Sequence, residues 1–273
     1  MALTAVVLGD NCIDRYLPPV GRDYIGGQAV NVASHLVALG LSVAYAGVVG
    51  TDPAGRRITT ELIDRRVKVD LVERRRGNTG VTVIDVSAIG DRRFVEEAYG
   101  VSAPYRPTAE ALAASRRAQL VYAAHLDTVC SLRDEISPPA TLALDWSDGD
   151  LSGLDATPDV LFVSRPGTSL TAGEELARQL ATSIGCLVVL TLGRCGAAAA
   201  SAAESCAIAA SAAPVVDTLG AGDAFAAAFL AARMRGRLLA ESMVEAAGRA
   251  AGTCRHHGGY LNDFAASSAL STS

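Results

Sequence analysis

The sequence predicts an α/β protein with a mostly parallel central sheet, helices on both faces of that sheet and a small β lid. Along most of the chain, short apolar runs alternate with segments of helical periodicity, which is the pattern of successive βα units. Residues 80–98 depart from this pattern with two alternating runs around Ala88–Asp91, typical of an antiparallel hairpin. No repeat and no long linker divides the 273 residues, so we expect a single domain.

Four elements are expected before the hairpin. The apolar run at 4–9 ends at a glycine and predicts a buried strand. Residues 29–40 have apolar positions at helical spacing and stop at Gly40, a residue type that commonly ends a helix. A second strand is predicted at 43–50. The helix expected at 53–66 carries proline in its first turn, where a missing amide does no harm.

Beyond the hairpin the strand–helix alternation resumes. Strands are expected at 120–124, 141–146, 160–164 and 186–193, with helices at 108–118 and 171–182. The alanine-rich segment 197–213 has two interpretations, because alanine favours a helix whereas the serines and Pro214 suit a pair of strands. We favour the strands, and expect a helix of small residues to begin near Gly222.

Composition argues against several classes of function. The net charge is −5 and no long basic run occurs, which disfavours a nucleic-acid groove or an anionic membrane surface as partner. The most apolar stretch, 197–216, is mainly alanine and too weakly hydrophobic to span a bilayer. The N-terminus lacks the basic start of a signal peptide, and the six cysteines form no C-x-x-C pair. A reduced, cytoplasmic protein is the simplest expectation.

The stretch Asp217–Asp223 (DTLGAGD) places a carboxylate directly behind two glycines at the start of a helix. The first amides of a helix lack intrahelical partners and, together with the helix dipole, favour an anion. The amides of Gly220, Ala221 and Gly222 are therefore candidates for an anion hole. Asp223 would then be the base that takes a proton from a hydroxyl during phosphoryl transfer. On the residues alone, a helix cap behind a tight turn is an equal alternative.

The stretch GGQAVNVA, residues 26–33, is a second candidate for ligand binding. Gly26 and Gly27 allow a ligand to approach the backbone, and Asn31 offers both a donor and an acceptor to a hydroxyl. A plain turn into a helix, with a solvent-facing asparagine, is the alternative.

The stretch GDNCID, residues 9–14, directly follows the first predicted strand. In an open parallel sheet the ligand crevice lies at the carboxyl ends of the strands. Asp14 is therefore a candidate to accept hydrogen bonds from sugar hydroxyls. For Asp10 we favour a structural role as a cap.

The stretch TLGRCGAAA, from Thr191 to Ala199, combines a strand end with Gly193 and Gly196. It lacks the G-x-G-x-x-G fingerprint that a dinucleotide-dependent oxidoreductase would need. No G-x-x-x-x-G-K-[ST] loop occurs either, and the single lysine, Lys68, is far from any glycine loop. If this protein binds a nucleotide, it does so without the usual lysine. The four histidines show no metal-ligand spacing.

These stretches together resemble the PfkB family of ribokinase-like carbohydrate kinases. GGQAVNVA is similar to the N-terminal signature of the family, DTLGAGDAF to its C-terminal signature, and TLGRCG to its loop along the nucleotide. The resemblance implies a ribokinase-like fold over 1–273, with lid elements at about 11–25 and 80–98. It implies ATP and Mg²⁺ as cofactors, leaves the use of K⁺ open, and suggests a homodimer through the lid strands.

The resemblance also implies a role for each candidate residue. Asp223 would be the general base and Gly220, Ala221 and Gly222 the anion hole. The sugar pocket would be lined by Asp14, Gly26, Gly27 and Asn31, and the residues near ATP would be Thr191, Gly193 and Gly196. Metal ligands stay unassigned.

Within the family, GDNCIDRY, its short connection to GGQAVNVA, and the late HHGGY most resemble kinases that phosphorylate ketosugar amines such as fructoselysine at the 6-position. Kinases of fructose, ribose or a keto-deoxy sugar acid are alternatives, as is a non-catalytic sugar-binding regulator. One departure supports the regulator. Many members carry an Asn-x-x-Glu motif whose glutamate organises magnesium, but here the register gives Ser164-Arg165-Pro166-Gly167.

Overall fold

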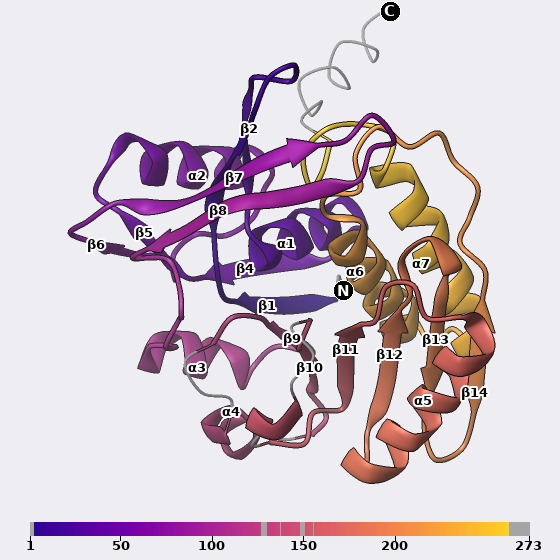
Figure 1. Cartoon of the computed structure of the whole chain (residues 1–273). Helices are drawn as coiled ribbons and strands as arrows, with labels where there is room; N and C mark the ends of the chain where they lie inside the picture. Colours follow the sequence, from indigo (N-terminus) through magenta and orange to yellow (C-terminus); the bar gives the residue numbers. More distant parts are fainter. Residues whose placement is uncertain (1–2, 127–129, 137, 148–150, 155, 262–273) are drawn as a thin grey trace, which may run out of the picture.

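The computed structural model describes residues 3–126, 130–136, 138–147, 151–154 and 156–261, and the structural statements below concern these residues. Its centre is an eight-stranded sheet in the order β14-β13-β12-β11-β10-β9-β1-β4 (Figure 1). These strands are β1 (Thr4–Leu8), β4 (Ser42–Ala46), β9 (Leu120–Ala123), β10 (Thr141–Asp145), β11 (Val160–Ser164), β12 (Leu187–Thr191), β13 (Ala197–Ala200) and β14 (Ser205–Ile208). Every pair from β4 to β12 is parallel, whereas β13 and β14 are antiparallel.

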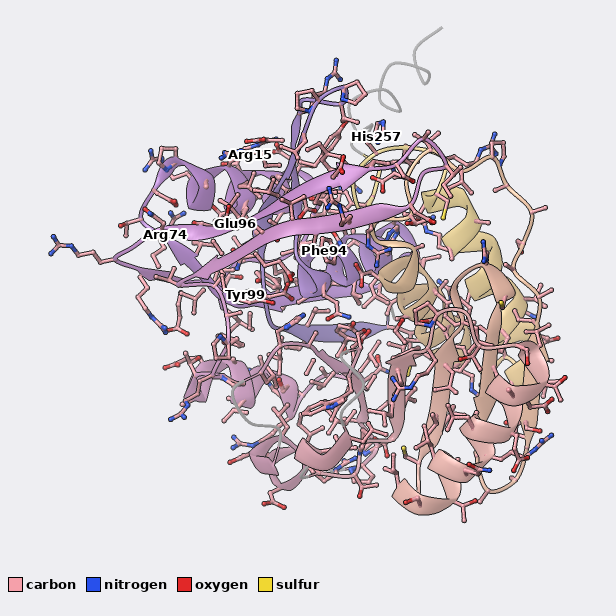
Figure 2. The ribbon with its side chains drawn as sticks, in the orientation of Figure 1. Arg15, Arg74, Phe94, Glu96, Tyr99 and His257 are labelled. Atoms are coloured by element: carbon pink, nitrogen blue, oxygen red, sulfur yellow. The ribbon has the colours of Figure 1, made fainter. Side chains whose placement is uncertain are left out.

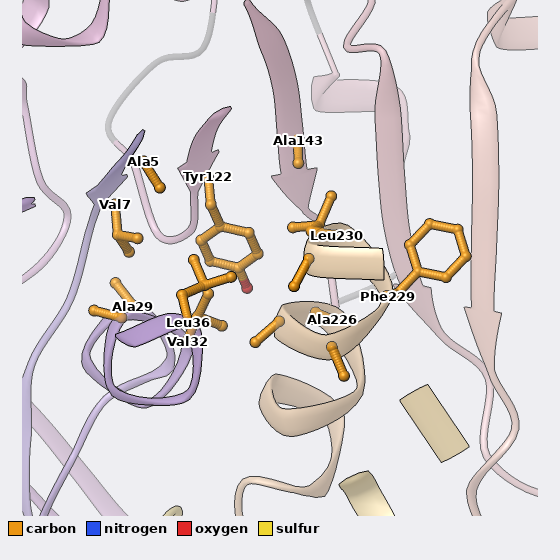
Figure 3. Close-up of a cluster of buried hydrophobic side chains, with 14 of the residues drawn as sticks. Ala5, Val7, Ala29, Val32, Leu36, Tyr122, Ala143, Ala226, Phe229 and Leu230 are labelled. Carbon is orange, nitrogen blue, oxygen red and sulfur yellow. The ribbon is translucent and has the colours of Figure 1, made fainter. Parts of the chain in front are cut away.

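Helices cover both faces of this sheet, as expected. They are α1 (Gln28–Ala38), α2 (Pro53–Asp64), α3 (Ala109–Ser115), α4 (Cys130–Glu135), α5 (Leu170–Ile184), α6 (Ala221–Met234) and α7 (Leu239–Thr253). Two short 3₁₀ helices lie at Leu151–Gly153 and Gly193–Cys195. One hydrophobic core packs α1, α2, α6 and α7 with one face, and a second packs α3, α4 and α5 with the other. Figure 3 shows Leu36 of α1 and Leu230 of α6 beside Tyr122 of β9.

A second, four-stranded sheet has the order β3-β2-β7-β8, and we call it the small sheet. Its strands are β2 (Cys12–Tyr16), β3 (Asp23–Gly26), β7 (Thr79–Val86) and β8 (Arg92–Gly100). The hairpin expected at 80–98 is confirmed, because β7 and β8 pair antiparallel around the turn that ends at Asp91. Since β2 begins four residues after β1 ends, the small sheet starts at the carboxyl edge of the central sheet.

The other predicted elements are also present, apart from the single strand at 43–50, which is wrong. That segment divides at Gly47 into β4 and β5 (Val48–Gly50), and β5 pairs with β6 (Glu73–Arg75) in a separate sheet. A Cβ atom at Gly47 would lie 2.2 Å from the Tyr45 hydroxyl and 2.6 Å from the Gly9 carbonyl oxygen, so the chain turns where only glycine fits. The segment 197–213 forms the favoured strand pair, β13 and β14.

The strand order has a topological switch point at β1. The next strand of this sheet along the chain, β4, lies on one side of β1, and the strand after it, β9, lies on the other side. Ligands of open α/β sheets bind at such a switch point, outside the carboxyl ends of the strands. None of the helices within the described ranges is long and apolar enough to cross a membrane.

Candidate active site

The N-terminus of α6 carries the proposed anion hole. Gly220 precedes the helix with φ of +72°, and a Cβ atom there would lie 2.4 Å from Cα of Gly259, so glycine is required. The Ala221 amide donates a long turn bond of 3.3 Å to the Thr218 carbonyl. Among the described residues no side chain caps this helix, and Gly222 is exposed with open space around it. The amides of Gly222 and Asp223 are therefore open to an anion, whereas the amide of Ala221 already has a partner.

Asp223 lies in the first turn of α6 and contacts α1. The Nδ2 atom of Asn31 donates a 2.7 Å hydrogen bond to Oδ2 of Asp223. Asn31 is buried, and its Oδ1 atom has no hydrogen-bond partner among the described residues. A buried acceptor without a partner is costly, so a ligand hydroxyl at this position would stabilise the site.

The pKa of Asp223 is raised to about 8. Burial is the main cause, and the negative charges of Asp145 and Asp10 add to it. The hydrogen bond from Asn31 and the positive charge of Arg92 oppose this rise. A carboxylate whose pKa lies near neutrality is suited to general base catalysis.

Asp14 lies on β2, where its side chain is buried, and the thiol of Cys12 donates a 3.2 Å hydrogen bond to its Oδ1 atom. Burial raises the pKa of Asp14 to about 7 against the opposing effect of this bond. A Cβ atom at Gly26, on the neighbouring strand β3, would lie 1.8 Å from Oδ2 of Asp14. Gly26 is therefore required because it makes room for the Asp14 carboxylate.

Asp10 acts as a cap, as favoured from the sequence, although its target is helix α1. Its two carboxylate oxygens accept hydrogen bonds from the amides of Gln28 and Ala29, at 2.9 and 3.1 Å. Gly27 is the residue that precedes α1, with φ of +99°, and a Cβ atom there would lie 2.5 Å from Cα of Asn11. The second glycine of GGQAVNVA is thus explained by the packing of the β1–β2 connection.

Asp217 joins the loop before α6 to the small sheet and to the C-terminal loop. Its buried carboxylate accepts hydrogen bonds from the Tyr16 hydroxyl, the Leu219 amide at 2.9 Å and the Gly258 amide at 3.3 Å. His257 contacts the Tyr16 ring edge-on and is labelled at this junction in Figure 2. No local sequence pattern predicts this network, because its members are spread over the whole chain.

A second contact fixes the C-terminal loop against α1. His35 is buried, and its Nε2 atom lies 2.9 Å from the carbonyl oxygen of Gly259. Burial lowers the pKa of His35 to about 3, so this ring is neutral. A Cβ atom at Gly259 would lie 2.4 Å from the Asn31 amide, which explains a glycine of HHGGY.

Arg92, at the start of β8, brings a positive charge from the small sheet to the site. Its Nη1 atom donates a 3.0 Å hydrogen bond to the Thr218 carbonyl, and the Thr218 amide donates to the Gly90 carbonyl at 3.1 Å. The positive charge of Arg92 lowers the pKa values of both Asp14 and Asp223, against the larger effect of burial. Nothing in the local sequence distinguished Arg92 from the other surface arginines.

The residues expected near ATP lie at the same edge of the sheet, at the ends of β11 and β12. The Thr191 carbonyl accepts a 2.8 Å bond from the Arg165 amide, and a Cβ atom at Gly193 would lie 3.5 Å from Pro166. Gly196 has a packing reason of its own, since a Cβ atom there would lie 2.0 Å from the Ile208 carbonyl oxygen. Gly167 has φ of +83°, a conformation that glycine adopts more readily than other residues.

Known proteins that resemble this chain over most of its length are sugar kinases. A model described as pfkB family carbohydrate kinase matches residues 17–264. Fructoselysine 6-kinase of Escherichia coli is 30% identical over 262 residues, which cover 94% of this chain and 99% of that enzyme. Fructosamine kinase FrlD of Bacillus subtilis is 28% identical over 267 residues, covering 93% of this chain and 92% of that one.

Two solved structures show the fold. The structure of Arabidopsis thaliana ribokinase complexed with ribose and ATP has a TM-score of 0.78 at 22% identity and covers 94% of each chain. Adenosine kinase from Sinorhizobium meliloti has a TM-score of 0.81 at 20% identity, covering 98% of this chain and 99% of that one. The ribokinase-like fold expected from the sequence is confirmed.

Proposed function

Because the chain belongs to the pfkB family of carbohydrate kinases, we propose that it transfers the γ-phosphate of ATP to the 6-hydroxyl of a ketosugar amine such as fructoselysine. Two relatives that align over more than nine-tenths of the chain are named for amine-linked sugars, which supports this substrate class. The single observation that carries the catalytic assignment is the hydrogen bond from Asn31 to Asp223 beside the open amides of α6.

In the proposed reaction Asp223 is the general base. The hydrogen bond from Asn31 occupies Oδ2, so Oδ1 is left to take the proton of the sugar hydroxyl. The hydroxyl oxygen of the sugar attacks the γ-phosphorus of ATP, and ADP leaves. The amides at the start of α6, which include those of Gly222 and Asp223, stabilise the negative charge on the transferred group. Arg92 adds a positive charge from the small sheet.

The sugar is held between the small sheet and α1. Asp14 accepts hydroxyl hydrogen bonds, and Oδ1 of Asn31 accepts one more. The backbone of Gly26–Gly27 lies beside Asp14 and approaches the ligand without side chains in the way. In this proposal β2, β3, β7 and β8 form the lid expected at 11–25 and 80–98, and they exclude water from the transfer.

The nucleotide lies at the ends of β11 and β12, along Thr191, Gly193 and Gly196. No group of three or more His, Cys, Asp or Glu side chains suited to a metal occurs within the described ranges. We therefore expect Mg²⁺ to arrive with ATP, held by phosphate oxygens and water, as this ion commonly is. Bound there, it would neutralise charge on the phosphates. Parallel assays in K⁺ and Na⁺ salts test the use of potassium.

We also propose a homodimer that forms through the lid strands. All nine residues of β8 are exposed, and Figure 2 shows Phe94 and Glu96 along this strand. Antiparallel pairing of two β8 strands centred between Phe94 and Val95 places Arg93 of one copy opposite Glu96 of the other. Opposite charges that face each other across a strand pair stabilise it.

Sedimentation velocity tests the dimer. Glu96→Arg and Arg93→Glu should each weaken the dimer by placing like charges opposite each other. The double variant should restore the dimer in part, because opposite charges again face each other, although Arg93→Glu also removes the ion pair between Arg93 and Asp85 of β7. A monomeric wild type, or a double variant as weak as the single ones, would contradict this pairing.

ADP release from purified protein with ATP, Mg²⁺ and a sugar panel tests the proposed activity. The panel contains fructoselysine, fructose, ribose and a keto-deoxy sugar acid, and phosphorus–proton NMR of the product identifies the phosphorylated position. We expect the highest kcat/KM with the ketosugar amine and phosphate on carbon 6. Sugar binding by calorimetry without turnover would instead identify a regulator.

A further inference from the structure

A cavity of about 350 Å³ lies between the end of the small sheet and the carboxyl ends of β9 and β10. Pockets for small molecules are typically about 300–1,000 Å³. Most of its walls are apolar or aromatic, with Leu126, Leu144 and Trp146 on the central sheet side. Tyr99 of β8, labelled in Figure 2, also lines the cavity, and its ring centroid lies 6.1 Å from that of His125.

Helix α1 connects this cavity to the catalytic centre. Gln28, in its first turn, lines the cavity and donates a 3.2 Å hydrogen bond to the hydroxyl of Ser147. Asn31, three residues later, donates to Asp223. Three residues correspond to a rise of about 4.5 Å along a helix. A sugar with its 6-hydroxyl at Asp223 can therefore direct its other end into the cavity.

Among the described residues that line the cavity, Asp145, the last residue of β10, is the one carboxylate. It accepts hydrogen bonds from the Tyr122 hydroxyl, at 3.0 Å, and from the Ser147 hydroxyl. Burial raises the pKa of Asp145, and its charge in turn raises that of Asp223. None of the described residues that line the cavity is a lysine or an arginine. A carboxylate in such surroundings favours a ligand that brings its own positive charge.

We propose that the cavity binds the amine-linked substituent of the sugar, and that Asp145 accepts a hydrogen bond from the substrate ammonium. This inference rests on the proposed kinase function. The apolar walls favour a substituent with an uncharged aliphatic or aromatic body. A carboxylate next to the nitrogen is disfavoured, because it would lie against Asp145, and among the described lining residues only His125, and no lysine or arginine, could pair with it. Asp145 thus favours sugars that carry an amine over sugars that do not, and the apolar walls favour amines with an uncharged substituent.

Three substrates test the selection: fructose, benzyl fructosamine and glycine fructosamine. A hydrogen bond between charged groups is worth about 10- to 100-fold in affinity. We expect kcat/KM for benzyl fructosamine to exceed that for fructose by about this factor. Glycine fructosamine, which has the same ammonium but an adjacent carboxylate, should be at least about ten-fold poorer than the benzyl compound. Equal values for the two amines, or for benzyl fructosamine and fructose, would overturn the proposal.

Two variants test whether the preference for benzyl fructosamine over fructose arises in the cavity. Asp145→Asn should reduce the benzyl fructosamine to fructose ratio of kcat/KM about ten-fold or more, and this ratio cancels any general effect on Asp223. Ala103→Leu narrows the cavity and should reduce the same ratio, whereas Ala203→Leu, on the exposed turn between β13 and β14, should not. A ratio unchanged in both cavity variants would overturn the proposal. If Ala103→Leu does not fold, the Asp145→Asn ratio decides alone.

Calorimetry with benzyl fructosamine separates this inference from the kinase function. If no sugar supports ADP release, but the benzyl compound binds wild type at least about ten-fold more tightly than Asp145→Asn, the cavity assignment stands and the kinase function fails. If sugars are phosphorylated but both proteins bind the benzyl compound equally, the cavity assignment fails and the kinase function stands.

Discussion

The side-chain amide of Asn31 donates a 2.7 Å hydrogen bond to Oδ2 of Asp223, although 192 positions separate the two residues in the sequence. The bond joins α1 to the first turn of α6 and fixes one oxygen of the carboxylate. It also favours the ionised form of Asp223, against burial and the charges of Asp145 and Asp10. The protonation of the proposed base is therefore set by Asn31 on α1, Asp145 on β10 and Asp10 in the connection between β1 and β2.

Substitutions at Asn31 and Asp145 should shift the pH dependence of the reaction in opposite directions. The rate of a base-catalysed step rises with pH as the base loses its proton. Asn31→Leu removes a bond to the ionised form, so the pKa of Asp223 rises above about 8 and the rising limb of kcat/KM moves to higher pH. Asp145→Asn removes a negative charge, so the limb moves to lower pH. Profiles measured with fructose decide the matter, and shifts of the same sign would refute this assignment of the base.

Asp223→Asn should lower kcat by about 10²–10⁴, the usual contribution of a positioned acid or base. The substitution keeps the shape of the side chain and one hydrogen-bonding oxygen, so the fold should persist. Asp70→Asn, at an exposed position, is the matched control and should have wild-type kcat. Turnover of Asp223→Asn within a factor of about two of wild type would show that Asp223 is not the catalytic base.

The same variant should change the stability of the protein in a pH-dependent way. Asp223 ionises near its ordinary pKa of 3.8 when unfolded and near 8 when folded. Between these values the folded state holds the extra proton, so stability falls as pH rises through this window. Asp223→Asn removes that loss, and thermal melts should show it gaining stability relative to wild type from pH 5 to pH 8. A difference that does not change with pH would contradict the raised pKa.

The alternation of apolar runs was sufficient to predict the layers of the fold, because buried parallel strands and amphipathic helices leave strong local patterns. The division of 43–50 at Gly47 was not predictable, since it depends on the Tyr45 hydroxyl and the Gly9 carbonyl. Helix α7 was also missed. Its alanine and glycine content gives a weak pattern, and it is stabilised by packing against α6.

In the candidate site, too, some residues could be predicted from a local motif and others could not. Asp223, Asn31 and Asp14 stand in motifs with a local chemical reason, and the sequence was enough to select them. Arg92 and Asp217 act through partners more than 100 residues away in sequence, Thr218 and Tyr16 respectively, which no local pattern reveals. Asp145 could have been found, since it ends a predicted strand at the carboxyl edge of the sheet.

Asp14→Ala should weaken the binding of sugar far more than the binding of ATP. A carboxylate that accepts a hydroxyl hydrogen bond contributes about 1.5–3 kcal/mol. Gly26→Ala provides an independent test, because its Cβ atom would lie 1.8 Å from Oδ2 of Asp14 and must displace that carboxylate. Calorimetry should show for both variants a loss of affinity for the sugar that is far larger than the loss of affinity for ATP. Equal losses for sugar and ATP would mean that Asp14 supports the fold and does not contact the substrate.

Gly167→Glu tests whether the turn after β11 lies on the magnesium side of the site. Gly167 has φ of +83°, so any side chain there should cost about 1–2 kcal/mol of stability. The position has open space around it, and a glutamate would add a carboxylate, an oxygen ligand that suits Mg²⁺. Gly167→Gln carries the same strain without the charge and is the matched control.

Both Gly167 variants should therefore melt at a lower temperature than wild type and to a similar extent. Only Gly167→Glu should reach its half-maximal rate at a lower concentration of free magnesium. Because the two side chains differ only in charge, that difference isolates the effect of the carboxylate from the effect of the strained backbone. An identical magnesium dependence in the two variants would show that residues 164–167 do not correspond to the Asn-x-x-Glu motif of the family.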